Sequence, residues 1–186
     1  MIDQAPPLEL RTARMTLLAC DLAHFDAILE GDAAVERLLG VPAADDWMGG
    51  FDAAIEAMAP ARAGLEADPG LRPWWMRLFL HTAERRLIGL GGYKGRPDAE
   101  GVVEIGYALA PAYRGRGLAS EAAVALALAA FEAVGVNRVR AHTLPEENDS
   151  TAVLRRMGMS FEQAVHDAED GDIWRWSGAA GDLRSV

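Results

Sequence analysis

Cysteine is almost absent from this chain: Cys20 is the single one among 186 residues. A lone cysteine cannot form a disulfide within the chain, so the sequence is compatible with a reducing compartment. The first seven residues, M-I-D-Q-A-P-P, lack the basic region and apolar core of a secretory signal peptide. We therefore expect a soluble cytoplasmic protein.

Long apolar runs and excess positive charge are missing as well. The longest uninterrupted apolar run, residues 122–131, is too short to span a bilayer. The formal net charge of −10 and the pI near 4.8 disfavour nucleic acid and anionic membranes as partners. The four histidines show no metal-ligand spacing, and the acidic segment 167–172 lacks the length and distal glutamate of a calcium loop. No metal site is predicted.

The order of apolar and helical segments predicts one α+β or α/β domain, residues 1–186, with a mixed sheet. Strands are expected at residues 15–20, 74–81, 86–93, 102–109, 137–143, 159–166 and 172–176, the last two as a hairpin around Asp170-Gly171. Helices are expected at residues 22–30, 118–134 and 149–157, with one or two more between 32 and 73. Gly158 is predicted to end the helix that precedes it.

The most informative segment is a basic, glycine-rich turn between a strand and a helix. It reads R-G-R-G-L-A, with Arg114 and Arg116 alternating with Gly115 and Gly117. Glycines leave backbone N–H groups unobstructed, and the positive end of the helix dipole lies at the same place. Such a turn is a predicted phosphate site, and cations kept in an acidic protein are expected to meet an anion.

Several interpretations of this turn compete. A P-loop requires a lysine inside the motif, and no lysine follows Lys94. A dinucleotide fingerprint requires a third glycine where Ser120 stands, and residues 111–114 separate the strand from the turn. A solvated turn with basic side chains is the structural alternative.

The surrounding landmarks resemble the Gcn5-related N-acetyltransferase (GNAT) superfamily. Residues 114–119 match its [Q/R]-x-x-G-x-[G/A] signature in full. The ribosomal-protein-alanine acetyltransferase (RimJ/RimL-like) branch also shares further short motifs, in the same order. These are R-L-I-G-L-G-G-Y at 86–93, E-I-G-Y at 104–107, Pro111, Glu121-Ala122, H-T-L-P at 142–145, N-x-S-T at 148–151 and Gly158-Met159. The resemblance is firmest over residues 74–162.

The resemblance implies a GNAT fold and a coenzyme. The fold is a single mixed, mostly antiparallel central sheet of about six to seven strands, flanked by helices and splayed between its two central strands. Acetyl-CoA is the implied co-substrate, with its pyrophosphate on the turn and its pantetheine arm in the splay. The implied cofactor-binding residues are Leu109, Arg114, Gly115, Arg116, Gly117, Leu118, Ala119, Ser120 and Asn148.

The resemblance also implies catalytic roles. Glu104 matches the general base, acting through a water, with the raised pKa expected of a carboxylate flanked by apolar strand residues. Many members carry a tyrosine where this chain has Leu154, so Ser150 or solvent is expected to assist the leaving thiolate. Asn148 is equally well explained as a helix cap.

The implied function is acetyl-CoA-dependent N-acetylation of a primary amine by direct attack in a ternary complex. The acceptor is a protein N-terminus or a small amine, and residues 32–73 carry no legible code that selects among them, although Trp47 lies in the region that shapes the acceptor site in relatives. A homodimer is also compatible with the resemblance. A non-catalytic acyl-CoA-binding or regulatory module and a nicotinamide-dependent oxidoreductase are the alternative functions.

Overall fold

Eight strands form one mixed sheet in the computed structural model, which describes residues 5–49, 52–167 and 171–184. The strand order is β1-β2-β3-β4-β5-β6-β8-β7, and every neighbouring pair is antiparallel except β5 and β6. The strands are β1 (Glu9–Arg11), β2 (Met15–Ala19), β3 (Met76–His81), β4 (Arg86–Tyr93), β5 (Val102–Leu109), β6 (Arg138–Thr143), β7 (Ser160–Asp167) and β8 (Gly171–Gly178). The mixed sheet is confirmed, with one strand more than expected: the three-residue β1 pairs with β2 at the edge.

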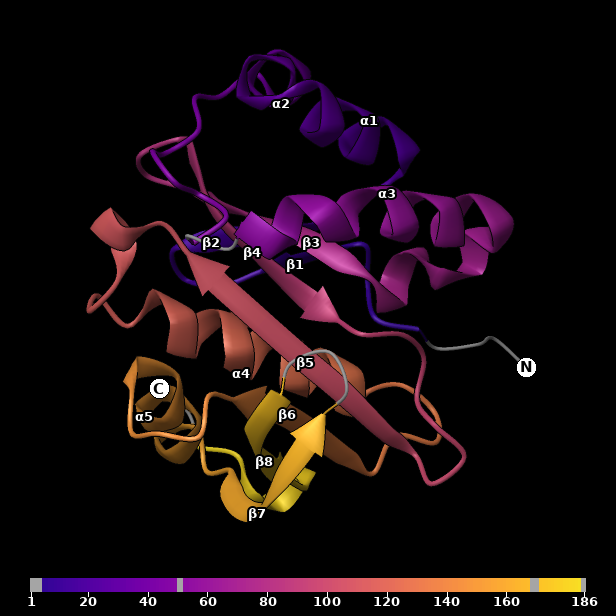
Figure 1. The fold of residues 1–186 in the computed structure, drawn as a ribbon, viewed down its shortest axis with the longest axis vertical. Coiled ribbons are helices and arrows are strands. Elements are labelled where there is room, and N and C mark those ends of the chain that lie inside the picture. Colours follow the sequence, from indigo (N-terminus) through magenta and orange to yellow (C-terminus); the bar gives the residue numbers. More distant parts are fainter. Residues whose placement is uncertain (1–4, 50–51, 168–170, 185–186) are drawn as a thin grey trace.

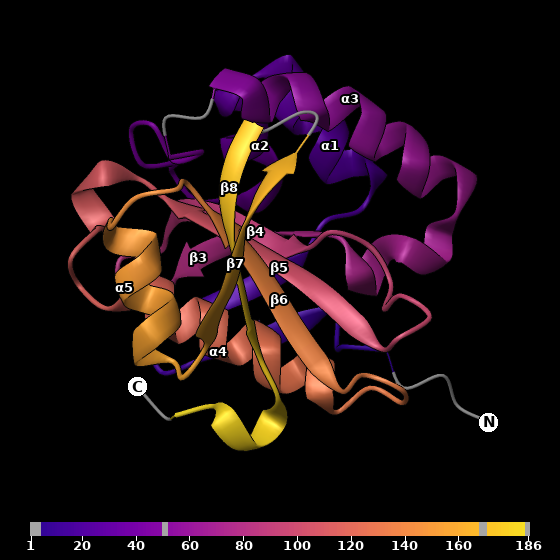
Figure 2. The same cartoon turned by 60° about the horizontal axis from the view of Figure 1, so that its bottom comes forward.

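Helices cover the sheet on both sides. The α-helices are α1 (Leu22–Glu30), α2 (Asp32–Leu39), α3 (Asp52–Ala67), α4 (Leu118–Phe131) and α5 (Asp149–Arg156), and short 3₁₀ turns span Pro69–Trp74, Pro111–Tyr113 and Ala180–Asp182. Helices α1 to α3 form one layer and α4 lies on the other side of the sheet (Figures 1 and 2). The segment expected to hold one or two helices holds α2 and α3, followed by a 3₁₀ turn.

Strands β5 and β6, in the interior of the sheet, separate after a short region of pairing. Strand β5 pairs with β6 in parallel over only three positions, Val102↔Arg138, Val103↔Val139 and Glu104↔Arg140. Beyond Glu104 the rest of β5 keeps its partner β4 but has none on the β6 side. Because backbone N–H and C=O groups need partners, this open edge is a ready docking surface for an extended ligand.

Helix α4 packs closely because its buried positions are mainly alanine and leucine. Leu118, Ala122, Ala123, Leu126 and Ala130 are at most 1% exposed, and the helix lies against β5. Small side chains let the helix backbone approach the sheet, while each fully buried leucine contributes roughly 1.5–3 kcal/mol. The glycine turn is thus anchored to the core through the helix that it begins.

Two expectations made for aromatic and hairpin residues have different outcomes. Trp47 is 2% exposed, and its indole Nε1 donates to Asp32 at 2.9 Å. It is therefore a core residue, and the expectation that it could line an acceptor surface is wrong. Strands β7 and β8 pair as predicted, but Asp170 of the predicted turn lies outside the described residues.

No helix among the described residues is long and apolar enough for a membrane span. That residues 1–186 form one domain stays a prediction.

Candidate active site

The glycine turn presents a row of unused backbone donors. Gly115 and Gly117 have φ values of +69° and +76°, a left-handed conformation that favours glycine. Gly117 is the N-cap of α4 and supplies no side-chain cap. Within the described part of the chain, the N–H groups of residues 115–120 donate to no protein acceptor. Free donors at the positive end of a 14-residue helix are suited to binding an anion.

A cation from the first hairpin holds this turn in place. The Arg14 side chain, which follows β1, contacts Glu121 in the first turn of α4, with Nε 2.6 Å from Oε2. Its Nη1 atom donates to the carbonyl oxygen of Arg116 at 2.8 Å, and its backbone N–H donates to Glu121 at 2.8 Å. These contacts fix the turn from the protein side and leave the donors on its other side available.

Both arginines of the turn have partners in the protein. Arg114 donates to the carbonyl oxygens of Leu109 at 3.1 Å and Gly49 at 2.8 Å. Arg116 contacts Glu84 at 3.0 Å and stacks over the Tyr113 ring. The two side chains therefore brace the turn against its neighbours, which differs from the expectation that both meet a bound anion.

A cavity of about 640 Å³ runs from the turn along the splay. Its volume lies in the range of small-molecule and cofactor sites. The cavity wall joins two neighbouring segments, the end of β5 and the glycine turn with the first turn of α4, to a segment further along the chain, the loop that leads into α5. Its wall includes Leu109, Arg114, Gly115, Gly117, Leu118, Ala119, Ser120 and Asn148, which are eight of the nine residues expected to bind the cofactor, and also Ser150. Arg116 is not on the wall.

One cation on this wall was not predicted from the sequence. Arg156, in the last turn of α5, donates to the hydroxyl of Ser120 at 3.2 Å and lines the cavity. The neighbouring Arg155 instead pairs with Glu147 and stacks over Trp176. The sequence shows two adjacent arginines but does not indicate which of them turns toward the glycine turn.

Residues at the start of α5 also line the cavity. Asn148 is the N-cap of α5, and its Oδ1 atom accepts from the Thr151 backbone at 3.0 Å, so the helix-cap interpretation is confirmed. The Tyr107 hydroxyl lies 3.5 Å from the backbone oxygen of Ser150. Burial raises the pKa of the Tyr107 phenol, which is therefore neutral. Leu154 is 1% exposed and belongs to the core.

Glu104 lies where β5 and β6 separate, paired with two basic groups. Its Oε1 atom is 2.7 Å from Nζ of Lys94 and 3.0 Å from Nδ1 of His142. Burial acts to raise the pKa of Glu104, but these two partners outweigh it, and the pKa is lowered. The expectation of a raised pKa is wrong because the sequence did not show that two basic side chains converge on this carboxylate.

His142 connects Glu104 to a further cation. On the side away from Glu104, its Nε2 atom accepts from Nε of Arg175 at 3.3 Å. In the neutral ring this leaves the proton on Nδ1, where it points at Glu104. Lys94, Glu104, His142 and Arg175 form a continuous series of contacts, called here the vertex cluster. His142 was visible in the H-T-L-P motif, but nothing in the sequence indicated its partners.

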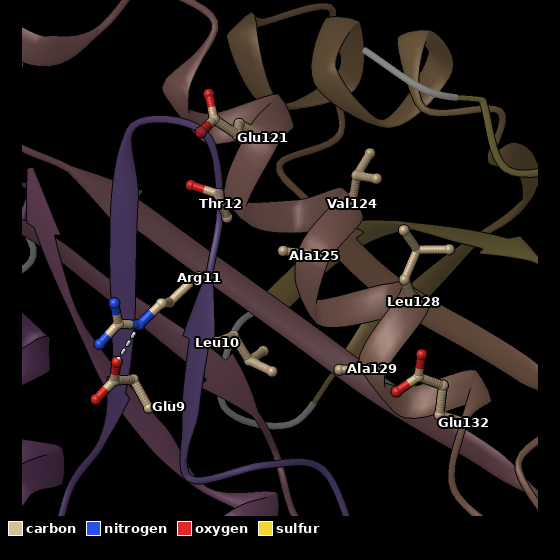
Figure 3. Close-up of a pocket in the computed structure, with 10 residues that line it drawn as sticks. All are labelled: Glu9, Leu10, Arg11, Thr12, Glu121, Val124, Ala125, Leu128, Ala129 and Glu132. Atoms are coloured by element: carbon tan, nitrogen blue, oxygen red, sulfur yellow. Dashed lines mark hydrogen bonds and ion pairs between the residues drawn. The ribbon is translucent and has the colours of Figure 1, made fainter. Parts of the chain in front are cut away.

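A second hollow, of about 370 Å³, lies between β1 and the outer side of α4 (Figure 3). Its walls are Leu10, Val124, Ala125, Leu128 and Ala129, and its charged groups are Glu9, Arg11, Glu121 and Glu132. Arg11 is paired with Glu9 at 2.7 Å. Three carboxylates would repel a phosphate, and the one arginine among the lining residues is already paired with one of them. The glycine-turn cavity is therefore the candidate coenzyme site. Among the described residues, no group of His, Cys, Asp and Glu could hold a metal ion.

Comparison with known proteins gives one family and one fold. A sequence model of the acetyltransferase (GNAT) domain matches residues 14–160. The uncharacterized N-acetyltransferase YjdG of Bacillus subtilis (strain 168) is 26% identical over 149 residues, covering 80% of this chain and 88% of YjdG.

Solved structures have the same architecture. A putative GNAT-family acetyltransferase from Bordetella pertussis aligns with a TM-score of 0.67 and 22% identity, over 93% of this chain and 100% of the other. RimJ of Mycobacterium smegmatis, solved in complex with CoA-disulfide, aligns with a TM-score of 0.63 and 22% identity, over 96% and 88% of the two chains. These likenesses confirm the predicted fold, and RimJ is among the structural neighbours.

Proposed function

Because the chain belongs to the acetyltransferase (GNAT) domain family, we propose that it is an N-acetyltransferase that moves the acetyl group of acetyl-CoA to a primary amine. The acetyl donor follows from the family. The amine acceptor, either a protein N-terminus or a small molecule, and the residues that act on it are our proposal. The observation that carries the proposal is the row of free N–H donors at residues 115–120, placed at one end of a cavity that opens into the splay.

The diphosphate of acetyl-CoA binds this row. Each charge-assisted hydrogen bond contributes about 1.5–3 kcal/mol, and the helix dipole adds about 0.3–1 kcal/mol. Three such bonds approach the roughly 8 kcal/mol of micromolar binding before the costs of association are counted. Arg156, beside Ser120, adds a positive charge at the same end of the cavity.

The pantetheine arm occupies the splay. The open edge of β5 beyond Glu104 offers backbone groups to its amides, as an added strand would. Leu109 and Asn148 lie on the cavity wall along this path. The thioester then lies near the point where β5 and β6 separate, next to the vertex cluster.

The chemistry is a direct transfer. The amine nitrogen attacks the thioester carbonyl, a C–N bond forms as the C–S bond breaks, and the amine proton passes to the Glu104 carboxylate through a water. The CoA thiolate leaves and takes a proton from the wall, where the Ser150 hydroxyl and the neutral Tyr107 phenol are the available donors. The lowered pKa of Glu104 keeps its carboxylate ionised and able to accept a proton at neutral pH.

Steady-state kinetics and one substitution test the proposal. Initial rates with both substrates varied are expected to give intersecting lines, because direct transfer needs a ternary complex; parallel lines would contradict it. The Glu104→Gln variant keeps the side-chain shape and removes the base, so kcat falls by roughly 10²- to 10⁴-fold while acetyl-CoA affinity is retained. Glu56→Gln, an exposed change on α3, is the matched control.

A non-catalytic acyl-CoA-binding module is the second candidate function. Its support is Leu154, which stands in the core where many relatives carry the tyrosine acid. Binding of acetyl-CoA without acetylation of any peptide, polyamine or amino acid in a panel would favour the module over the enzyme.

A further inference from the structure

The sheet face beside the proposed thioester position is rich in positive charge. Cα partners on neighbouring strands project their side chains to the same face, and the register pairs Glu104 with Arg140 and His142 with Arg175. Lys94 joins this face through its contact with Glu104. Three cationic side chains, Lys94, Arg140 and Arg175, therefore share a sheet face with one carboxylate, Glu104, where β5 and β6 separate.

Two of these cations have no acidic partner. Among the described residues, no carboxylate oxygen comes within 4.0 Å of a guanidinium nitrogen of Arg140 or Arg175. The nearby Glu162 contacts Arg138 and Ser177 instead. Arg175 donates instead to a ring nitrogen, Nε2 of His142, at 3.3 Å.

Arg140 carries a further sign of an incomplete site. Its side chain is partly buried, and its Nε atom is inaccessible to water without a hydrogen-bond partner in the described structure. Removing a guanidinium N–H from water without a partner is costly, so such groups are usually satisfied. The chain has 28 acidic and 18 basic residues, so carboxylates outnumber the basic side chains. Two neighbouring arginines without a carboxylate partner are therefore unexpected.

The cluster is within reach of an acceptor. The side chains of Lys94, Glu104 and His142 are 58%, 22% and 16% exposed. The positive charge of the cluster also helps the reaction, because it lowers the pKa of a bound amine and so favours the neutral, nucleophilic form of that amine.

This arrangement discriminates among the acceptors left open by the fold. A polyamine or an aminoglycoside brings several positive charges into a region that already holds unpaired cations, which costs free energy. An amine that carries its own carboxylate or phosphate supplies the missing anion, and a guanidinium binds either group through paired hydrogen bonds.

We propose that the acceptor is a primary amine with an anionic group close to it, and that Arg175 and Arg140 bind that anion while Glu104 receives the amine proton. The inference rests on the proposed acetyltransferase function and narrows its substrate class. A small amino acid and a protein N-terminus followed by an acidic residue share this chemistry.

Matched acceptors test the proposal on the full-length protein. The first pair is the tripeptide amides Ser-Asp-Ala and Ser-Asn-Ala, which differ only in the charge of the second side chain. The second pair is β-alanine and β-alaninamide, with rates corrected for the fraction of free amine, and spermidine is the polycation. The anionic member of at least one pair is expected to have a kcat/KM about 10-fold or more above its neutral partner. The pair that shows this difference identifies whether the acceptor is a peptide N-terminus beside an acidic residue or a small amino acid.

Arg175→Gln and Arg175→Lys assign the effect to the cluster. Loss of the charge is expected to bring the acid-to-amide ratio of kcat/KM close to one through a higher KM for the anionic acceptor, with the KM for acetyl-CoA unchanged. Lysine keeps the charge and part of the preference. A purely structural role would lower both members of a pair equally. Arg37→Gln, at an exposed ion pair on α2, is the control.

The outcomes separate the two proposals. Equal or better acetylation of the neutral amides or of spermidine overturns the anionic-acceptor assignment and leaves the acetyltransferase function standing. Binding of acetyl-CoA without acetylation of any amine overturns the proposed function, and this assignment with it.

Discussion

The Nζ atom of Lys94 lies 2.7 Å from Oε1 of Glu104, and Lys94 is the single lysine of the chain. The two residues face each other across the β4–β5 pair, where the Lys94 backbone N–H also donates to the Glu104 carbonyl at 3.0 Å. The ion pair counteracts the burial of Glu104 and, with His142, lowers its pKa. Strand pairing thus determines the proton affinity of the proposed catalytic base.

Removing this ion pair is expected to change the pH profile. In Lys94→Met the charged form of Glu104 loses an opposite charge, so its pKa rises toward or above the ordinary carboxyl value. The acidic limb of kcat/KM against pH is expected to move to higher pH, while Arg37→Met leaves it in place. An acidic limb at the same pH in both variants would show that Glu104 does not titrate in the reaction.

Alanine substitutions at two glycines with similar backbone angles distinguish the effect of backbone strain from an effect on coenzyme binding. Gly115 and Gly135 have φ values of +69° and +88°, and a Cβ at either meets no atom within 4 Å. Alanine is therefore expected to destabilise both variants by a similar amount, about 1 kcal/mol. Only Gly115→Ala is expected to weaken acetyl-CoA binding in calorimetric titrations, because Gly115 lines the cavity. Equal affinities in the two variants would remove the turn from the binding site.

Arg14 is expected to affect coenzyme binding without belonging to the cavity wall. Arg14→Met removes the contacts to Glu121 and to the Arg116 carbonyl, so the N–H donors lose their fixed directions. Acetyl-CoA affinity is expected to fall about 3- to 30-fold, the range of one or two hydrogen bonds. The comparison is Arg11→Met, which removes a surface pair with Glu9 on the same hairpin. A similar loss in both variants would indicate general destabilisation instead.

Tyr107 and Ser150 are expected to contribute to departure of the thiolate. Tyr107→Phe and Ser150→Ala each remove one hydroxyl from the cavity wall, and the one that protonates sulfur is expected to lower kcat about 10-fold or more. A thioester with a more acidic leaving thiol is expected to restore the rate of that variant. If both variants retain the full rate with acetyl-CoA, solvent supplies the proton.

The local parts of this site were predictable, and the long-range contacts were not. The turn at 114–119 and the cap at Asn148 follow from residue types at fixed spacing, because their backbone geometry is local. The vertex cluster joins Lys94, Glu104, His142 and Arg175 from four different strands or strand ends, and strand register alone decides that they meet. The sequence therefore predicted a carboxylate in an apolar strand but did not show the two basic side chains, Lys94 and His142, that lower its pKa.

Other differences have the same origin. Strand β1 is too short for an alternating pattern and exists because β2 offers it an edge. Trp47 was expected in the region of the acceptor site, but it lies in the core, where its indole donates a hydrogen bond to Asp32. Arg156 reaches Ser120 across 36 positions of sequence, a contact that depends on how α5 packs beside α4.

The most direct test is a crystal structure of the protein with bound coenzyme A. The diphosphate oxygens are expected within hydrogen-bond distance of the N–H groups of residues 115–120, with the pantetheine arm between β5 and β6 and its sulfur near Glu104. Coenzyme located elsewhere on the molecule, or a diphosphate held without these amides, would contradict this expectation.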